Sequence, residues 1–294
     1  MTMKKNILLA LILSFAIFSC VSEKGEQNKP SVIVSILPQK YFIERIADTL
    51  LHVEVMVPPG SSPETYEPTP LQLMAFSKAK VYFSLGLLNF EKTTLKNITE
   101  QNPNVKVVVH SVSLNLIEGD HNHLHNGHAH NHGYDPHVWT SPSEVQTMVG
   151  DIVLALSNEF PDYAETFKTN ANLFIRDIEL LDMHIQKSFA GFEGAKFFIF
   201  HPALSYFARD YGLVQVSFEE EGKSPSAKHL KSIMKQANAE GMRTIFIQRE
   251  FDINIAQTAA ADIKGEVVVI DPLEADWLNN MYSITNRIKK AIEK

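Results

Sequence analysis

The sequence predicts an α/β protein with two similar lobes of mostly parallel sheet, joined by a long rigid helix, with a metal site in the cleft between the lobes. Three observations lead to this prediction. A series of strands alternating with helices occurs twice along the chain, and one long amphipathic helical pattern separates the two series. Polar side chains that can bind a metal follow strand ends in both halves.

The chain begins with a segment typical of export. In residues 1–19, two lysines precede an apolar run from Ile7 to Phe18 that is too short to span a bilayer, which indicates a signal peptide. The motif IFSC, ending at Cys20, resembles a bacterial lipobox, which implies cleavage before Cys20 and a lipid on that residue. An ordinary secretory signal that contains a cysteine is the alternative. Residues 20–30 are polar and are expected to form a lipid-anchored tether.

Charge and cysteine content restrict the function. Loss of residues 1–19, with their two lysines, changes the formal net charge from −7 to −9, which argues against nucleic acid as a partner and suits a cation-binding protein. Cys20 is the only cysteine, so disulfides within the chain and thiolate metal sites are both excluded. Any bound metal must therefore be held by nitrogen and oxygen atoms.

Residues 31–158 are predicted to form the N-terminal lobe. Four buried-looking strands are expected in SVIVSILP, HVEVMVPPG, KVYFSLG and NVKVVVHSV. Helical patterns separate them, the clearest being the one in PLQLMAFSKA. Strands that alternate with helices in this way form parallel sheets.

Residues 193–294 repeat this order and are predicted to form the C-terminal lobe. Its four strands are expected in AKFFIF, LVQVSF, MRTIFIQ and GEVVVI. The opening strand is followed by similar residues in the two halves, ILPQKYF and FHPALSYF, which favours two lobes of one architecture.

Residues 159–192 are predicted to contain the linking helix. Pro161 is a suitable first helical residue, and apolar residues follow at spacings of three and four from Phe167 to Phe189. A helix of this length would extend about 45 Å, enough to brace both lobes, so closure around a ligand should be small. The alternative is the seam of a coiled-coil dimer, but the apolar stripe is broad, and a monomer is expected.

A histidine-rich loop at 120–133 indicates a transition metal. Six histidines fall within twelve positions and lack any apolar periodicity, so the tract should be a solvated loop that captures metal ions weakly. These histidines are His121, His123, His125, His128, His130 and His132. A plain low-complexity linker is the alternative reading.

Four polar residues follow predicted strands and are candidate ligands of a tight site. They are Glu64, His137, His201 and Asp271. Ligands of parallel α/β sheets bind at the carboxyl ends of strands, and two imidazoles with two carboxylates can coordinate zinc. Each residue has a simpler explanation: a loop acid for Glu64, a strand-end or capping histidine for His137, a core histidine for His201 and a helix N-cap for Asp271.

The motifs PPGSSPETYEPTP, DPHVWTSP, FHPALSYFARDYG and VVIDPL, in this order, resemble the substrate-binding lipoproteins of bacterial metal-ion ABC transporters of the zinc and manganese type. The resemblance covers essentially the whole mature chain, and the histidine tract is similar to that of zinc-specific members. It implies two α/β lobes joined by a rigid helix, with His137, His201 and Asp271 as metal ligands. It also implies a location outside the cytoplasmic membrane and a permease as partner.

Two residues depart from the family's pattern. Glu64 stands where members usually have histidine, which moves the ligand set some way toward manganese. Gln248 stands where glutamate is common, and Glu250 is a nearby replacement for the lost charge.

The expected function is capture of Zn²⁺ and its delivery to an ABC permease, without enzymatic activity. Mn²⁺ is the alternative metal. A zinc reservoir or adhesin is a further alternative, because the histidine tract alone would serve it. A metalloenzyme is disfavoured because the sequence has no HExxH, GxSxG or Walker A motif.

Overall fold

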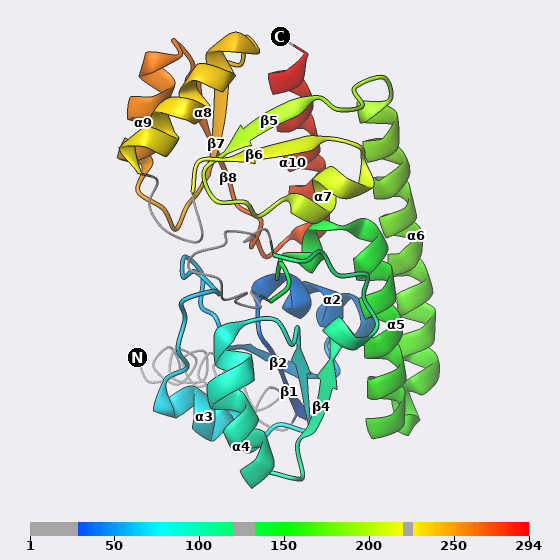
Figure 1. Cartoon of the computed structure of the whole chain (residues 1–294). Coiled ribbons are helices and arrows are strands. Elements are labelled where there is room, and N and C mark those ends of the chain that lie inside the picture. Colours follow the sequence, from blue (N-terminus) through cyan, green and yellow to red (C-terminus); the bar gives the residue numbers. More distant parts are fainter. Residues whose placement is uncertain (1–28, 120–132, 220–225, 294) are drawn as a thin grey trace, which may run out of the picture.

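A computed structural model describes residues 29–119, 133–219 and 226–293. Within these ranges the chain forms two lobes, one above the other in Figure 1, and each contains a four-stranded sheet. The predicted signal peptide, Cys20 and the six histidines of the tract lie outside the described residues. In the part of the chain that is described, no helix has the length and apolar character needed to cross a membrane.

The N-terminal lobe is a parallel sheet with strand order β2-β1-β3-β4. The central strands β1 and β3 are almost entirely buried, as expected for a parallel sheet with helices on its faces. The lobe contains β1 (Ser31–Val34), α2 (Leu37–Ala47), β2 (His52–Val55), α3 (Pro70–Phe76), β3 (Val81–Ser84), α4 (Lys96–Gln101) and β4 (Lys106–Val109).

The C-terminal lobe has the same arrangement, with strand order β6-β5-β7-β8 and all pairs parallel. It contains β5 (Lys196–Ile199), α7 (Ser205–Asp210), β6 (Val214–Ser217), α8 (Ala227–Ala239), β7 (Thr244–Gln248), α9 (Ile253–Asp262) and β8 (Glu266–Ile270). Two parallel-sheet lobes of one architecture confirm the predicted fold class.

One long helix, α6 (Ala164–Phe189), runs beside both lobes in Figure 1. It begins three residues later than predicted, because Pro161–Tyr163 form a 3₁₀ turn. The predicted apolar stripe is completely buried in the chain's own core, so it is not a coiled-coil seam. The stripe comprises Phe167, Ala171, Phe174, Ile178, Leu181, Ile185 and Phe189.

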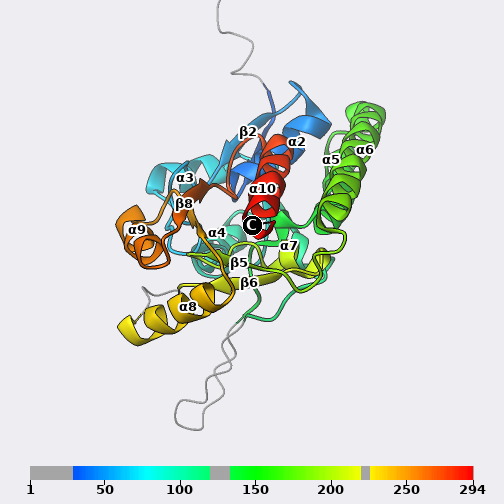
Figure 2. The same ribbon diagram turned by 90° about the horizontal axis from the view of Figure 1, so that it is seen from above.

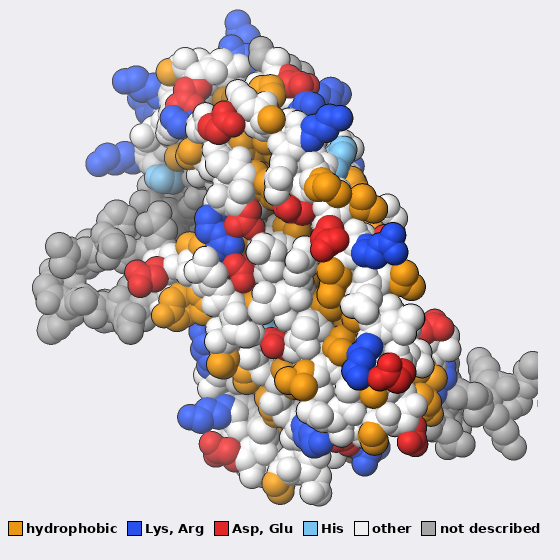
Figure 3. Space-filling view, turned by 90° about the vertical axis from the view of Figure 1, so that its right-hand side faces the viewer, with side chains coloured by type: hydrophobic (Ala, Val, Ile, Leu, Met, Phe, Trp, Pro, Cys, Tyr) orange, Lys and Arg blue, Asp and Glu red, His pale blue; other side chains and the backbone are white. Residues whose placement is uncertain are grey.

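Two helices that the sequence analysis did not identify complete this side of the molecule. They are α5 (Pro142–Glu159) and α10 (Trp277–Ile292), and both pack against α6. In Figure 2, α5 and α6 lie together at one side of the molecule, away from α8 and α9. The outer face of α6 exposes Leu173, Leu180 and Met183, and Figure 3 shows apolar side chains on this face interspersed with charged ones.

Buried hydrogen bonds join the lobes close to His137. The indole of Trp139 donates to the carbonyl of Pro272 at 2.9 Å, and the indole of Trp277 donates to the carbonyl of Trp139 at 2.7 Å. The hydroxyl of Tyr206, on α7, donates to the carbonyl of Asp135 at 2.8 Å. The backbone that carries His137 is therefore fixed by residues of the opposite lobe.

Candidate metal centre

Three of the four predicted ligands come together between the lobes. Glu64 lies in the loop after β2, His137 directly precedes a 3₁₀ turn at Val138–Thr140, and His201 follows β5. Each of the three contributes one ligand atom, and these atoms lie within 4.8 Å of one another. Both imidazoles are buried, with 6% exposure for each residue.

The three ligand atoms form a triangle of the size that a metal ion requires. The two Nε2 atoms of His137 and His201 are 3.2 Å apart. Oε1 of Glu64 lies 3.4 Å from Nε2 of His201 and 3.8 Å from Nε2 of His137. Ligands of tetrahedral zinc at about 2.0–2.1 Å from the ion are separated by about 3.3 Å, so this triangle resembles one face of the tetrahedron.

Asp135 orients the imidazole of His137. One carboxylate oxygen, Oδ1, lies 2.8 Å from Nδ1 of His137 and accepts the backbone N–H of the same residue at 2.8 Å. With the proton on Nδ1, Nε2 presents its lone pair to the triangle, which is the arrangement common at metal sites. The ring of Trp139 packs against His137, with centroids 5.2 Å apart.

His201 is held in a similar way by Glu219 and Gln248. Its Nδ1 is hydrogen-bonded to the Glu219 carboxylate, and its backbone carbonyl accepts from Nε2 of Gln248 at 2.7 Å. Phe251 stacks on the imidazole with centroids 5.2 Å apart. Gln248 thus fixes the backbone of a candidate ligand, a task for which an amide suffices.

Electrostatics favour a proton on His201 when no metal is bound. Burial acts to lower the pKa of His201, but the carboxylates of Glu219 and Glu64 outweigh it and raise that pKa to about 10. Burial likewise acts to raise the pKa of Glu64, yet the nearby imidazoles of His201 and His137 lower it below its ordinary value. The negative charge beside the imidazoles is therefore available to a cation.

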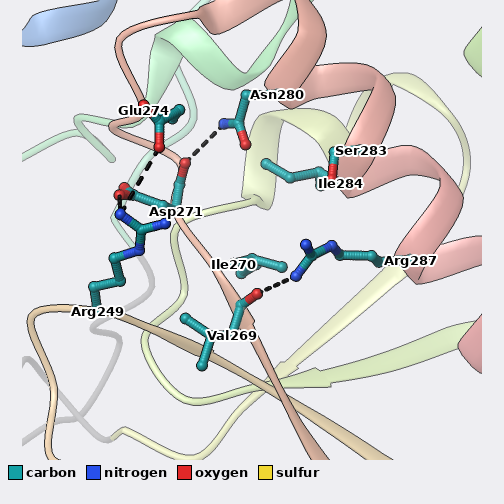
Figure 4. Close-up of a pocket in the computed structure, with 9 residues that line it drawn as sticks. All are labelled: Arg249, Val269, Ile270, Asp271, Glu274, Asn280, Ser283, Ile284 and Arg287. Carbon is teal, nitrogen blue, oxygen red and sulfur yellow. Dashed lines mark hydrogen bonds and ion pairs between the residues drawn. The ribbon is translucent and has the colours of Figure 1, made fainter.

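Asp271, the fourth predicted ligand, is not part of the triangle. Its Oδ2 lies 3.8 Å from Nη1 of Arg249 (Figure 4). Its Oδ1 accepts the backbone N–H of Leu273 at 3.0 Å. It does not cap a helix, since α10 begins later and is capped by Asp276. Asp271 nevertheless lines a cavity of about 380 Å³, to which residues 57–60 of the other lobe contribute.

Glu250 lines the same interlobe cavity. Burial and the neighbouring Asp271 raise the pKa of Glu250, while the imidazoles of His201 and His137 act to lower it. Glu250, which was expected to replace the negative charge missing at Gln248, therefore lies at the cleft between the lobes. It is not among the three residues whose ligand atoms come together.

The sequence analysis did not identify the partners of the two imidazoles. Asp135 lies two residues before His137, in the motif DPH, where a short polar side chain can hydrogen-bond the backbone that follows it. Glu219 lies just after β6, so the rule that sites form at the carboxyl ends of strands could have identified it.

Comparison with known proteins identifies the family of the chain. The profile of the ZnuA family, described as zinc-uptake complex component A, periplasmic, matches residues 32–291. The chain belongs to this family. The crystal structure of a ZnuA protein is 33% identical, superposes with a TM-score of 0.82 and covers 90% of this chain and 99% of the ZnuA chain.

Zinc-binding AdcA proteins of streptococci are also related to this ZnuA-family chain. The zinc-binding protein AdcA of Streptococcus pyogenes serotype M3 is 28% identical over 293 residues, and the zinc-binding lipoprotein AdcA of Streptococcus pneumoniae serotype 4 is 27% identical over 284 residues. The matches cover 92% and 93% of this chain but only 56% of each AdcA protein. The chain thus spans about half the length of these relatives.

Proposed function

We propose that this protein captures Zn²⁺ outside the cytoplasmic membrane and delivers it to an ABC permease. The observation that carries the proposal is the triangle of Glu64, His137 and His201, whose ligand atoms lie 3.2–3.8 Å apart. Membership of the ZnuA family, and the zinc-binding names of the AdcA relatives, support zinc as the cargo.

In the proposed site, Glu64, His137 and His201 are three ligands and Asp271 is the fourth. Asp271 follows β8 and lines the interlobe cavity, which supports its role. To bind the ion its carboxylate must turn away from Arg249. Asp135 and Glu219 hold the two imidazoles with their Nε2 atoms toward the ion.

The remaining parts of the proposal concern location and supply. Lipid on Cys20 would anchor the protein to a bacterial membrane, and the AdcA relative of S. pneumoniae is named a lipoprotein. The histidines of the 120–133 loop would raise the local zinc concentration without forming the tight site. We propose a transport role and no enzymatic one, because the matching family is named for zinc uptake and the AdcA relatives for zinc binding.

Manganese is the second candidate cargo. The observation that favours it is the carboxylate of Glu64 at a position where histidine is usual, because a harder ligand set shifts preference toward the harder ion. Two imidazoles in the triangle still favour zinc. A reservoir or adhesin role would not require the folded site.

The test is zinc titration of the metal-free protein and of His137→Ala and His201→Ala. Each substitution removes a ligand, and we expect each to weaken tight binding by about tenfold or more. Circular dichroism and thermal unfolding of the variants check that the fold is retained. Tight binding that survives both substitutions would overturn the proposed site.

A further inference from the structure

Arg249 is placed beside Asp271 by the register of the C-terminal sheet. In the parallel pair β7 and β8, Gln248 is paired with Ile270. The next residues, Arg249 and Asp271, therefore lie beside each other just beyond the strand ends. In Figure 4 the guanidinium of Arg249 lies between two carboxylates. Its Nη1 is 3.8 Å from Oδ2 of Asp271 and 3.9 Å from Oε2 of Glu274.

The backbone of Asp271 is fixed by Asn280, whereas its carboxylate has one hydrogen bond, from the backbone N–H of Leu273, and the longer contact with Arg249. Its carbonyl oxygen accepts from Nδ2 of Asn280 at 2.7 Å, and Oδ1 accepts from the backbone N–H of Leu273 at 3.0 Å. Because an aspartate side chain has two rotatable bonds, its carboxylate can change direction while its backbone stays in place. Rotation toward the triangle would separate Oδ2 from Arg249.

The contact with Arg249 is weak enough to be broken. The Arg249 side chain is 64% exposed, and ion pairs between exposed groups at this separation contribute little. Zn²⁺ carries twice the charge of a guanidinium and would be enclosed by buried imidazoles, so it can displace Arg249 from the carboxylate. The free energy needed to break the pair still makes zinc binding weaker than it would be without Arg249.

We propose that Arg249 competes with the metal ion for Asp271, holding the carboxylate out of the site in the free protein and lowering zinc affinity. This inference rests on the proposed role of Asp271 as a zinc ligand. Two neighbouring residues at the end of β7 then have opposite effects on zinc binding. Gln248 holds the proposed ligand His201 in place, whereas Arg249 keeps the carboxylate of Asp271 away from the ion. Competition of this kind also eases release of the ion, because the departing metal leaves a carboxylate that Arg249 can take back.

A double-mutant cycle on the full chain tests the competition. Zinc affinity is measured by calorimetry in the presence of a competing chelator for wild type, Arg249→Gln, Asp271→Asn and the double variant. We expect Arg249→Gln to tighten zinc binding by about two- to fivefold, the range that an exposed ion pair allows. In the Asp271→Asn background the same substitution should have no further effect, because no carboxylate remains to be released.

Arg287→Gln is the matched control. Arg287 lines the same pocket as Arg249, but its guanidinium donates to the carbonyl of Val269 and not to Asp271 (Figure 4). The Arg287→Gln substitution also removes one positive charge, and it should leave the zinc affinity within about twofold of wild type. Unchanged or weaker zinc binding in Arg249→Gln would overturn the proposed competition. Equal tightening in the wild-type and Asp271→Asn backgrounds would overturn it too, because Arg249 would then act only by repelling the cation.

The same titrations separate this inference from the proposed function. Loss of tight binding in His137→Ala together with unchanged affinity in Arg249→Gln would reject the role of Arg249 and leave the zinc site standing. Tight binding that persists in His137→Ala would reject the proposed site, and the role of Arg249 with it.

Discussion

Glu64 should decide the metal preference of the proposed site. It is the one carboxylate of the triangle, and its backbone carbonyl accepts a hydrogen bond from Nδ2 of Asn89 at 3.3 Å, which ties its loop to the segment that follows β3. We expect Glu64→Ala to weaken zinc binding substantially. Glu64→His should restore or improve zinc binding and weaken manganese binding, because imidazole suits the softer ion. Paired zinc and manganese titrations decide this, and equal affinities in all three proteins would exclude Glu64 as a ligand.

His201 should make zinc binding depend on pH. With a pKa raised to about 10, His201 carries a proton at neutral pH in the free protein, and zinc must replace it. We expect about one proton to be released per zinc at pH 7, and affinity to rise from pH 6 to pH 8. Calorimetry in buffers of different ionisation enthalpy measures the protons released. Glu219→Gln should lower the number released, and no release in wild type would contradict the prediction.

The same shift affects the stability of the metal-free protein. The folded-state pKa of His201 lies above the ordinary value of 6.5, so its contribution is complete below about pH 6.5 and is lost as pH rises toward about 10. Zinc affinity and metal-free stability should therefore change in opposite directions across this range.

The candidate ligands could be predicted from the sequence more readily than the residues that contact them. The carboxyl-end rule selected both His137 and His201, although only His201 follows a strand closely, whereas His137 directly precedes a 3₁₀ turn. The same rule placed Asp271 at the cleft, but its contact with Arg249 depends on the register of β7 and β8, which no local pattern encodes. The short spacing of Asp135 and His137 was visible in the sequence, whereas the pairing of Glu219 with His201 joins residues that become neighbours only in the folded lobe.

Among the larger segments, the histidine tract and the folded site should act separately. The three clustered candidate ligands, Glu64, His137 and His201, all lie in the described part of the chain, after β2, directly before a 3₁₀ turn and after β5, respectively. We expect deletion of 121–132 to lower the number of weakly bound zinc ions and to leave the tight site almost unchanged, because a loop must lose conformational entropy whenever it closes on an ion. Stoichiometry by equilibrium dialysis and affinity by chelator competition report on the two separately. Loss of tight binding in the deletion would show that the tract is part of the site.

At the scale of the whole molecule, the lobes should move little when zinc binds. The α6 helix, with 26 residues and a length of about 39 Å, packs against α2 of one lobe and against α5 and α10. Small-angle scattering should give a radius of gyration near 18 Å, changing by less than about 0.5 Å on zinc addition. A decrease of about 1 Å or more would indicate hinge closure. The His137→Ala variant with zinc added is the matched control.

The overall architecture was accessible from the sequence because two periodicities dominate it. Short apolar runs marked all eight strands, and the spacing from Phe167 to Phe189 marked the buried stripe of α6. The helices α5 and α10 were overlooked, although Ser141 before Pro142 and Asp276 before Trp277 are helix caps that a search for start signals would have found. Strand order could not be predicted, since it depends on contacts between distant segments.

The paired tryptophans Trp139 and Trp277 give the protein an intrinsic optical probe. They are the chain's only tryptophans, both are 1% exposed or less, and the indole of Trp139 lies against the imidazole of His137 at 5.2 Å. Tryptophan emission from the native protein therefore originates beside the proposed metal position and at the junction of the lobes, so cargo loading should be observable in real time without a dye or a label.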